Sequence, residues 1–343
     1  MTQLAEPYSR LRKNRRLDLA AESPLAGPMA IYVEPTNVCN FRCTYCPESF
    51  ADYKERSGGY SRMDFAAFTS IADQILVLGK LKVLHFYMMG EPFLNRSLPE
   101  FLSLATAKRV AERTCVTTNG TVLDSSTIAR VLDSGLDYLR VSVYGATDET
   151  ATKRTGVPTK VSRVVSNVAA LKAARQTRSS SKPFIYIKMI DTGSEAENQL
   201  FLETFQPVGD EVAIEPVMNW NDPKEGNLAQ RSRGELLSSD YFRHAKRACP
   251  FPFYTLVIHS DLRVSVCCVD WAKEAVVGDL REESLTDIWR GTRLRDFRLA
   301  HLRGDRGQLT ACAACTYLYT APDNVDALSP ETYLSRCSST KGF

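Results

Sequence analysis

The chain has 343 residues, 44% of them hydrophobic and 24% charged, and its formal net charge is +3. This length accommodates one large domain, or a domain of about 200 residues with a smaller one, and the apolar content suffices for a packed core. The small net charge gives no indication of a nucleic-acid partner, and no apolar run is long enough to predict a membrane span.

The first 28 residues are predicted to be a basic N-terminal extension. Its cationic residues are Arg10, Arg12, Lys13, Arg15 and Arg16, and a solvated helix or tail explains them more simply than a site for an acidic partner. The apolar stretch that follows is too short for a signal peptide. Ten cysteines are too few for a disulfide scaffold, so we expect a cytoplasmic protein with thiols free to bind metal.

Residues 29–218 alternate β-branched or aromatic runs with amphipathic stretches, which predicts βα units around a parallel sheet. Strands are predicted at 30–34, 83–87, 114–118, 138–143, 184–190 and 211–217. Helices are predicted at 64–78, 98–109, 125–134, 162–175 and 194–205. Six such units are two fewer than a complete (β/α)8 barrel, so the predicted fold class is α/β, a partial (β/α)6 barrel of the TIM type with a lateral opening.

A change of pattern predicts a second, smaller domain. Residues 219–244 are polar and contain Pro223, Gly226 and Gly234, which indicates a linker. Residues 245–320 begin with two short strands, 255–258 and 263–266, that predict a β-hairpin, and a helix is expected from Ser284 to about Arg298. Residues 321–343 are assigned to a C-terminal tail.

Three cysteines, Cys39, Cys43 and Cys46, follow the first predicted strand at a spacing of C-x3-C-x2-C. Barrels of this type carry their chemistry in the loops at the C-terminal ends of the strands. Iron–sulfur clusters are usually held by four thiolates, so three would leave one iron open to a small molecule. Structural zinc usually has four Cys or His ligands, and an odd trio cannot pair internally as disulfides. The spacing therefore favours an iron–sulfur cluster over zinc or free thiols.

This trio resembles the defining motif of the radical S-adenosylmethionine (SAM) superfamily, and three further segments resemble its other motifs in family order. Residues 88–92, Met-Met-Gly-Glu-Pro, resemble the GGEP motif after the second strand. Residues 117–120, Thr-Thr-Asn-Gly, resemble the T-N-G segment after the third. Residues 141–145, Val-Ser-Val-Tyr-Gly, resemble the S-x-D-G region of the fourth.

The resemblance implies an enzyme whose 4Fe-4S cluster, held by the trio, cleaves SAM reductively to a 5′-deoxyadenosyl radical that abstracts a substrate hydrogen. It implies SAM contacts at Tyr45, Gly90, Glu91, Asn119, Ser142 and Arg154. In these roles Glu91 pairs with the ammonium group, Ser142 with the ribose and Arg154 with the carboxylate, and Tyr45 lies near the adenine. Each has a simpler interpretation as a cap, a strand residue, a surface cation or a packed aromatic ring.

The C-terminal part is similar to the shortened SPASM module called a twitch domain, which carries one auxiliary 4Fe-4S cluster. Its ligands are implied to be Cys249, Cys267, Cys312 and Cys315, at C-x17-C-x44-C-x2-C. Cys267 is preferred to Cys268 because of its offset from the hairpin turn. The family usually has Asp-Gly in that turn, whereas this chain has Asp261-Leu262, which leaves the turn type open.

A cluster closed by four thiolates is better suited to carrying electrons than to binding substrate, which favours an oxidation. The nearest analogy within the family is with dehydrogenases and epimerases of aminoglycoside and sugar antibiotic biosynthesis. The expected substrate is a sugar, aminocyclitol or nucleoside, and the expected reductant is of the flavodoxin or ferredoxin type. Weak candidates for a general base are Lys188, Glu215 and Asp222, each of which has an equal claim to be a salt-bridged barrel residue.

Several alternatives stay open at this stage. An epimerase would need a thiol hydrogen donor, for which Cys268, Cys115 and Cys337 are available. Carbon–carbon coupling on a sugar or nucleoside and radical maturation of a peptide are also compatible with the motifs. Only 38 residues precede Cys39, which disfavours a peptide-leader domain ahead of the barrel. A non-enzymatic metal or electron carrier is the alternative from another class.

Overall fold

The computed structural model describes residues 17–215, 221–222, 226–227, 246–313, 315–321 and 323–339. The basic cluster at 10–16 and most of the predicted linker lie outside these ranges. Within the linker, β7 (Asn221–Asp222) and β8 (Gly226–Asn227) form a small antiparallel pair.

One sheet of nine strands runs through the described chain in the order β11-β10-β9-β1-β2-β3-β4-β5-β6. Its parallel part comprises β1 (Ala30–Val33), β2 (Val83–Phe86), β3 (Thr114–Thr118), β4 (Tyr138–Val143), β5 (Phe184–Ile190) and β6 (Glu211–Glu215). All six lie where strands were predicted, so the predicted βα barrel without closure is confirmed.

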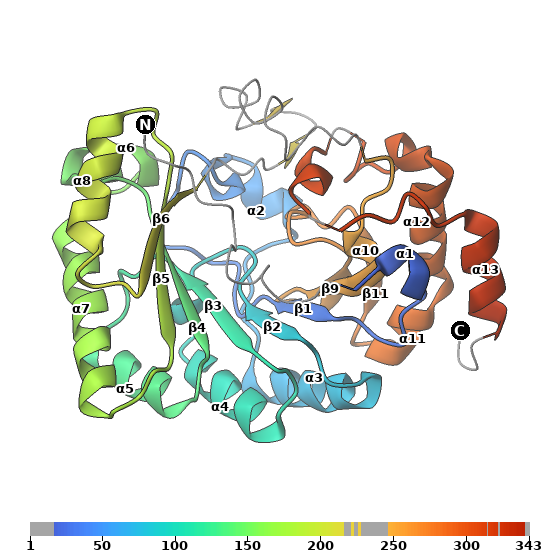
Figure 1. The fold of residues 1–343 in the computed structure, drawn as a ribbon, viewed down its shortest axis with the longest axis horizontal. Helices are drawn as coiled ribbons and strands as arrows, with labels where there is room; N and C mark the ends of the chain where they lie inside the picture. The colour runs from blue at the N-terminus through green and yellow to red at the C-terminus, as the bar shows by residue number, and fades with distance from the viewer. Residues whose placement is uncertain are drawn as a thin grey trace.

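Helices cover the outer face of this sheet, as Figure 1 shows along its left and lower sides. They are α3 (Phe65–Leu78), α4 (Leu98–Lys108), α5 (Ser125–Asp133), α7 (Val161–Thr177) and α8 (Glu195–Phe205). Asp64 and Asp124 begin α3 and α5, because their carboxylates accept hydrogen bonds from Ala67 N and Thr127 N, both at 2.7 Å. Shorter helices are α2 (Tyr53–Arg56) and α10 (Phe251–Tyr254).

Helix α6 (Asp148–Thr155) was not predicted from the sequence. Five of its eight residues are threonine, aspartate or glutamate, and only Ala151 and Thr155 are buried. The helix therefore has no apolar periodicity that could be detected in the sequence. Its start is defined locally, since the side chains of Thr147 and Thr150 form a capping box.

The two faces of the parallel strands differ in chemistry, because successive side chains point to opposite sides. Outward residues such as Ile31, Leu84 and Leu139 are fully buried against the helices. The alternating inward positions carry polar or aromatic side chains, among them Tyr32, His85, Arg140, Tyr186, Lys188 and Glu215. The inner face is therefore equipped for binding rather than for packing alone.

The C-terminal part continues the same sheet. Strand β9 (Thr255–Ile258) pairs in parallel with β1, with Ile31 opposite Leu256. β10 (Arg263–Ser265) pairs antiparallel with β9, which confirms the predicted hairpin, and β11 (Val276–Asp279) follows at the edge. Leu262 has a φ of +72°, so a leucine takes the left-handed conformation at the position where the family usually has glycine.

The single helix predicted from Ser284 is two helices, α11 (Leu285–Arg290) and α12 (Thr292–Arg303). Gly291 separates them with extended backbone at ψ 158°. The predicted tail contains a further helix, α13 (Pro330–Ser339), which lies beside α1 (Leu19–Glu22) in Figure 1. Arg336 joins these two helices by donating to the carbonyl oxygens of Ala20 and Ser23, each at 2.9 Å.

No helix within the described ranges combines the length and the apolar character that a membrane span requires.

Candidate active site

The cysteine trio lies in the loop that follows β1. Cys43 is buried, and Cys39 and Cys46 are half-buried. The loop folds on itself through Cys46 N, which donates to Cys43 O at 2.8 Å, and Phe41 N, which lies 3.4 Å from Cys39 Sγ. The three thiols are close enough to influence one another's ionisation.

The end of helix α6 supports this loop from the other side. Arg42 N and Thr44 N donate to the carbonyl oxygens of Thr155 and Arg154, both at 2.8 Å. Gly156, which ends the helix with a φ of +69°, lies so close that a Cβ there would be 2.7 Å from Arg42 O. The helix that sequence reasoning missed is thus part of the platform for the trio.

Burial raises the pKa of each thiol in the trio, that of Cys43 to about 12. The neighbouring carboxylate of Glu48 adds to this effect at all three. Buried thiols of this kind become thiolates when iron replaces the proton. The donor set and its enclosure therefore fit an iron–sulfur cluster.

Beside the trio, the buried Glu91 carboxylate accepts hydrogen bonds from three donors. It is 2% exposed and accepts from Asn119 N at 2.7 Å, Thr118 Oγ1 at 2.7 Å and Phe93 N at 3.2 Å. Burial raises its pKa to about 7, against the lowering by these three donors. No cationic side chain in the described ranges forms an ion pair with it, which leaves it available to an external ammonium group.

Gly90 allows this turn to pass directly beneath the cysteine loop. Its φ is +75°, and a Cβ there would lie 2.4 Å from Thr36 O and 2.8 Å from Val38 O. Glu91 N donates to Val38 O at 2.9 Å. Asn119 joins the same assembly, since its side-chain amide donates to Asn40 Oδ1 at 2.8 Å. The loops after the first three strands are therefore locked together.

The other predicted SAM contacts lie at the neighbouring strand ends. Ser142 is buried on β4, opposite Lys188 of β5. Tyr45 and Arg154 line a small pocket with Tyr144 and residues 189–192. The guanidinium of Arg154 forms two hydrogen bonds with the carboxylate of Glu197. A SAM carboxylate would therefore have to share this arginine with Glu197, a partner that the sequence did not reveal.

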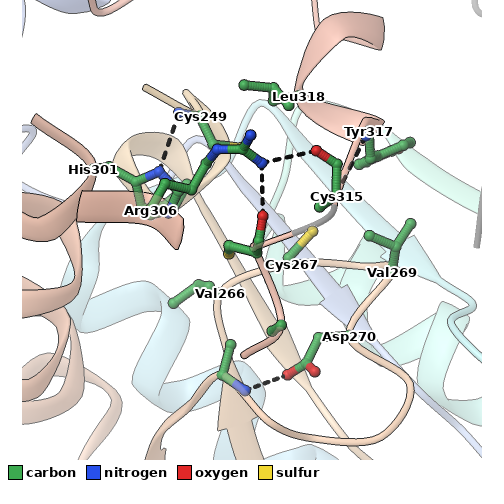
Figure 2. A pocket seen from close by; sticks show the side chains of 14 residues that line it. Cys249, Val266, Cys267, Val269, Asp270, His301, Arg306, Cys315, Tyr317 and Leu318 are labelled. Atoms are coloured by element: carbon green, nitrogen blue, oxygen red, sulfur yellow. Dashed lines mark hydrogen bonds between the residues drawn. The ribbon is translucent and has the colours of Figure 1, made fainter. Parts of the chain in front are cut away.

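The second group of cysteines surrounds a cavity beneath the hairpin, shown in Figure 2. Cys249, Cys267, Cys312 and Cys315 all line it. The Arg306 guanidinium donates to the carbonyl oxygens of Cys312 and Cys315, at 2.6 and 2.8 Å, and so fixes the C-terminal pair. Four thiols that line one cavity fit a fully ligated cluster.

Cys267 and Cys268 point to different surroundings. Cys267 lines the cavity, whereas Cys268 does not. The Cys268 thiol lies 3.5 Å from the hydroxyl group of Tyr317, and it also interacts with Tyr32 of the inner barrel face. This arrangement supports Cys267 as the ligand. The two other spare cysteines are buried, Cys115 on β3 and Cys337 within α13.

Two of the three base candidates come together on the inner face. The carboxylate of Glu215 accepts hydrogen bonds from Arg140 and from Tyr186 Oη, the latter at 2.8 Å, and Lys188 Nζ lies 3.7 Å away. Burial and the nearby Arg140 charge lower the pKa of Lys188 to about 8, although Glu215 opposes them. Asp222 is in β7, and its side chain lies outside the described part.

Arg140 was missed by sequence reasoning, although a signal was present. It occupies an inward position of β4, a strand whose six residues are all buried. A buried arginine requires a partner, and this could have marked the inner face of β4 before the structure was known.

Within the described ranges, no three His, Cys, Asp or Glu side chains are arranged around a single metal ion. A four-iron cluster has no such requirement, since each thiolate binds a different iron.

Comparison with known proteins bears out the class of protein. Residues 33–188 match the radical SAM superfamily, and residues 249–316 match SPASM, an iron–sulfur cluster-binding domain. The chain belongs to the radical SAM superfamily. It is a SPASM-type radical SAM enzyme that uses SAM and iron–sulfur clusters, as the motifs indicated.

Among curated proteins, the S-adenosyl-L-methionine-dependent 2-deoxy-scyllo-inosamine dehydrogenase of Niallia circulans is 22% identical over 304 residues, which cover 88% of this chain and 96% of that protein. Among solved structures, BtrN in complex with AdoMet and 2-DOIA has a TM-score of 0.54 at 21% identity, over 84% of this chain and 92% of BtrN. SuiB of Streptococcus suis bound to the precursor peptide SuiA has a TM-score of 0.60 at 15% identity, over 88% of this chain and 73% of SuiB. At these identities the structures establish a shared fold.

We expect Glu91→Gln to weaken SAM binding roughly tenfold or more, because a charge-assisted hydrogen bond contributes about 1.5 to 3 kcal/mol. The iron content should not change, since Glu91 is not among the expected ligands. Equilibrium binding of SAM to the reconstituted protein measures the effect. Glu112→Gln, at an exposed ion pair with Lys82, is the matched control. Equal affinity in the Glu91 variant would contradict the assigned contact.

We expect Cys267→Ala and Cys268→Ala to differ in iron content. Two four-iron clusters give about eight irons per chain, and Cys267→Ala should lose about half of them. Cys268→Ala should keep them all, because Cys268 does not line the cavity. Iron and sulfide analysis of anaerobically reconstituted protein provides the measurement, and the reverse pattern would make Cys268 the ligand. Stoichiometric zinc in place of iron at the second group would overturn the cluster assignment.

Proposed function

We propose that this enzyme is a dehydrogenase that oxidises a hydroxyl-bearing carbon of an aminocyclitol or related sugar intermediate in natural-product biosynthesis. The observation that carries the proposal is the complete set of four thiols around the second cavity. A cluster closed by four protein ligands has no vacant iron for substrate, so its use is electron transfer. The full-length similarity to a 2-deoxy-scyllo-inosamine dehydrogenase supports the substrate class.

When bound, SAM and the cluster held by Cys39, Cys43 and Cys46 would supply a 5′-deoxyadenosyl radical. The substrate carbon loses a hydrogen atom to that radical, and 5′-deoxyadenosine results. The hydroxyl proton passes to a base of the protein. Cys249, Cys267, Cys312 and Cys315 would hold the cluster that takes up the remaining electron. The C–H and O–H bonds are thereby replaced by a carbonyl group.

The inner barrel face suits a small, polar, hydroxylated substrate. Arg140, Glu215 and Lys188 provide charged groups on β4, β5 and β6. On the opposite side, His85 stacks on Tyr32 with ring centroids 4.4 Å apart. Such a surface combines hydrogen-bonding groups with aromatic walls.

Lys188 is the base that the surroundings favour. Glu215 already accepts two hydrogen bonds and its pKa is lowered by Arg140 and Lys188 despite its burial, which makes it a weak base. Within the described ranges, the Lys188 ammonium forms one ion pair, the 3.7 Å contact with Glu215. It also lies near enough to Cys43 for their charges to interact, which places it beside the trio. Lys188 therefore has both the position and the pKa of a general base.

The first cluster must be reduced before each turnover, and we assign this to a flavodoxin- or ferredoxin-type protein of the cytoplasm. The ten cysteines of the chain, all at positions without disulfide partners, suit a reducing compartment.

Epimerisation is the second candidate function, and the position of Cys268 favours it. This thiol lies at the boundary between the second cysteine group and the inner barrel face, where it contacts Tyr317 and interacts with Tyr32. A thiol there could return a hydrogen atom to a substrate radical. In that case Cys268→Ala would release 5′-deoxyadenosine without the epimer, whereas a dehydrogenase would keep forming ketone.

The reaction is tested with anaerobically reconstituted, dithionite-reduced protein, SAM and 2-deoxy-scyllo-inosamine. We expect 5′-deoxyadenosine and a ketone in equal amounts. 5′-Deoxyadenosine without ketone would direct the search to other sugars and aminocyclitols. The absence of 5′-deoxyadenosine from protein with intact clusters would count for a carrier and against an enzyme of this class.

We expect Lys188→Met to slow ketone formation about 10²-fold or more, as general bases typically contribute, while SAM still binds. For the unsubstituted enzyme, the rate should rise with pH up to about 8, because only the neutral amine accepts a proton and the pKa of Lys188 is lowered to about 8. Rates of ketone formation between pH 6 and pH 9 measure this. Lys182→Met, at an exposed ion pair, is the control, and a profile without that rise would exclude Lys188 as the base.

A further inference from the structure

His301 of α12 lies in the wall of the second cysteine cavity, where no role was expected for it. Its side chain is 0% exposed and it lines the cavity together with the four cysteines. Figure 2 shows its ring beside Cys249 and Arg306. A histidine enclosed so completely next to four metal-binding thiols requires an explanation in terms of hydrogen bonding.

The contacts of the ring determine where its proton lies. Cys249 N donates to His301 Nδ1 at 3.3 Å, drawn as a dashed line in Figure 2. A nitrogen that accepts a hydrogen bond carries no proton, so the neutral ring has its hydrogen on Nε2. Nε2 has no hydrogen-bond partner in the part of the chain that the structure describes. A buried N–H without an acceptor is unfavourable, and the cavity that the ring lines offers a place for one.

The same tautomer excludes direct ligation of iron by this ring. Nε2 holds the proton and Nδ1 is occupied by the N–H of Cys249, so neither nitrogen offers a free lone pair. The remaining capacity of the ring is to donate one hydrogen bond.

Charged groups of both signs line the cavity. They have opposite effects on the amount of negative charge that a cluster bound there can carry. Arg306 also lines it, and its guanidinium is held against the carbonyl oxygens of Cys312 and Cys315. Asp270 is the acidic group on the same wall, with its carboxylate accepting from Glu274 N and Ala275 N, both at 2.9 Å. A cation and an N–H donor thus line the cavity with the four thiols, and the carboxylate of Asp270 is capped by backbone N–H groups.

We propose that His301 donates its Nε2 hydrogen to a sulfur of the cluster held by Cys249, Cys267, Cys312 and Cys315, and thereby raises the reduction potential of that cluster. Hydrogen bonds to sulfur stabilise the more negative, reduced form of a cluster. The inference rests on the proposed function, in which this cluster accepts the second electron of the substrate. His301 is a positioning residue for that electron transfer.

The potential is measured in a full-length background where Cys39, Cys43 and Cys46 are replaced by Ala, so that only the second cluster contributes. In this background His301→Leu should lower the ratio of reduced to oxidised cluster about tenfold at a fixed potential, a shift of about 59 mV for one electron. His301→Gln, which keeps an amide donor, should recover most of the loss. Redox titration followed by electron paramagnetic resonance gives the values.

His259→Gln is the matched control, since this second buried histidine hydrogen-bonds Ser265 and does not line the cavity. Its midpoint potential should equal that of the unsubstituted protein. An unchanged potential in His301→Leu with full iron content would overturn the proposal.

A second measurement applies if His301→Leu fails to hold the cluster. Protein labelled with ¹⁵N-histidine should show a weak nitrogen hyperfine coupling to the reduced cluster, and this coupling should vanish in His301→Gln and persist in His259→Gln. No coupling, or the strong coupling of a ligating nitrogen, would contradict the hydrogen bond. Neither experiment uses SAM or substrate, so failure to oxidise an aminocyclitol and failure of this inference give separate results.

Discussion

The placement of both cysteine groups depends on strand β1 being paired on both edges. Ile31 lies opposite Leu84 of β2 on one side and opposite Leu256 of β9 on the other, and all three side chains are fully buried. The trio follows directly after the C-terminal end of β1, and Cys267 follows two residues after β10 of the same sheet. One continuous hydrogen-bonded ladder therefore sets the distance between the two candidate clusters. A flexible connection between separate domains could not hold two redox centres in a fixed relation.

A single buried carboxylate reinforces this junction. Glu34, the residue after β1, accepts hydrogen bonds from Met89 N at 3.2 Å and from Ser260 N at 3.0 Å. It thus joins the loop that leads to Glu91 with the turn of the C-terminal hairpin. Burial raises its pKa, but His259 and the Ser260 N–H outweigh burial, so the net shift is downward and the group is charged. A buried charge is tolerated only where its partners are fixed, so Glu34 disfavours movement of the hairpin relative to the barrel.

Local patterns in the sequence were sufficient for the strands and for the motifs. Short β-branched runs identified β1 to β6, and the cysteine spacing identified both sites, because these features depend on neighbouring residues. Part of what escaped prediction depends on distant residues. The pairing of β1 with β9 joins residues more than 200 positions apart, and the partner of Arg154 is Glu197 on another helix. Helix α6 carried no apolar period, and the positive φ of Leu262 has no signal in its residue type.

The surroundings of the two cysteine groups differ in charge in a way that fits their different tasks. Carboxylates of Glu48 and Glu91 disfavour extra negative charge near Cys39, which suits a cluster that must give its electron away. The Arg306 cation favours negative charge at Cys249, Cys312 and Cys315, which suits a cluster that receives one. SAM, a cation at its sulfur, would in turn offset the carboxylates when it binds. Lys188 near Cys43 and Asp270 near Cys312 act in the opposite sense, so the contrast rests on Glu48, Glu91 and Arg306, and the shared strand β1 keeps the two cysteine groups in register.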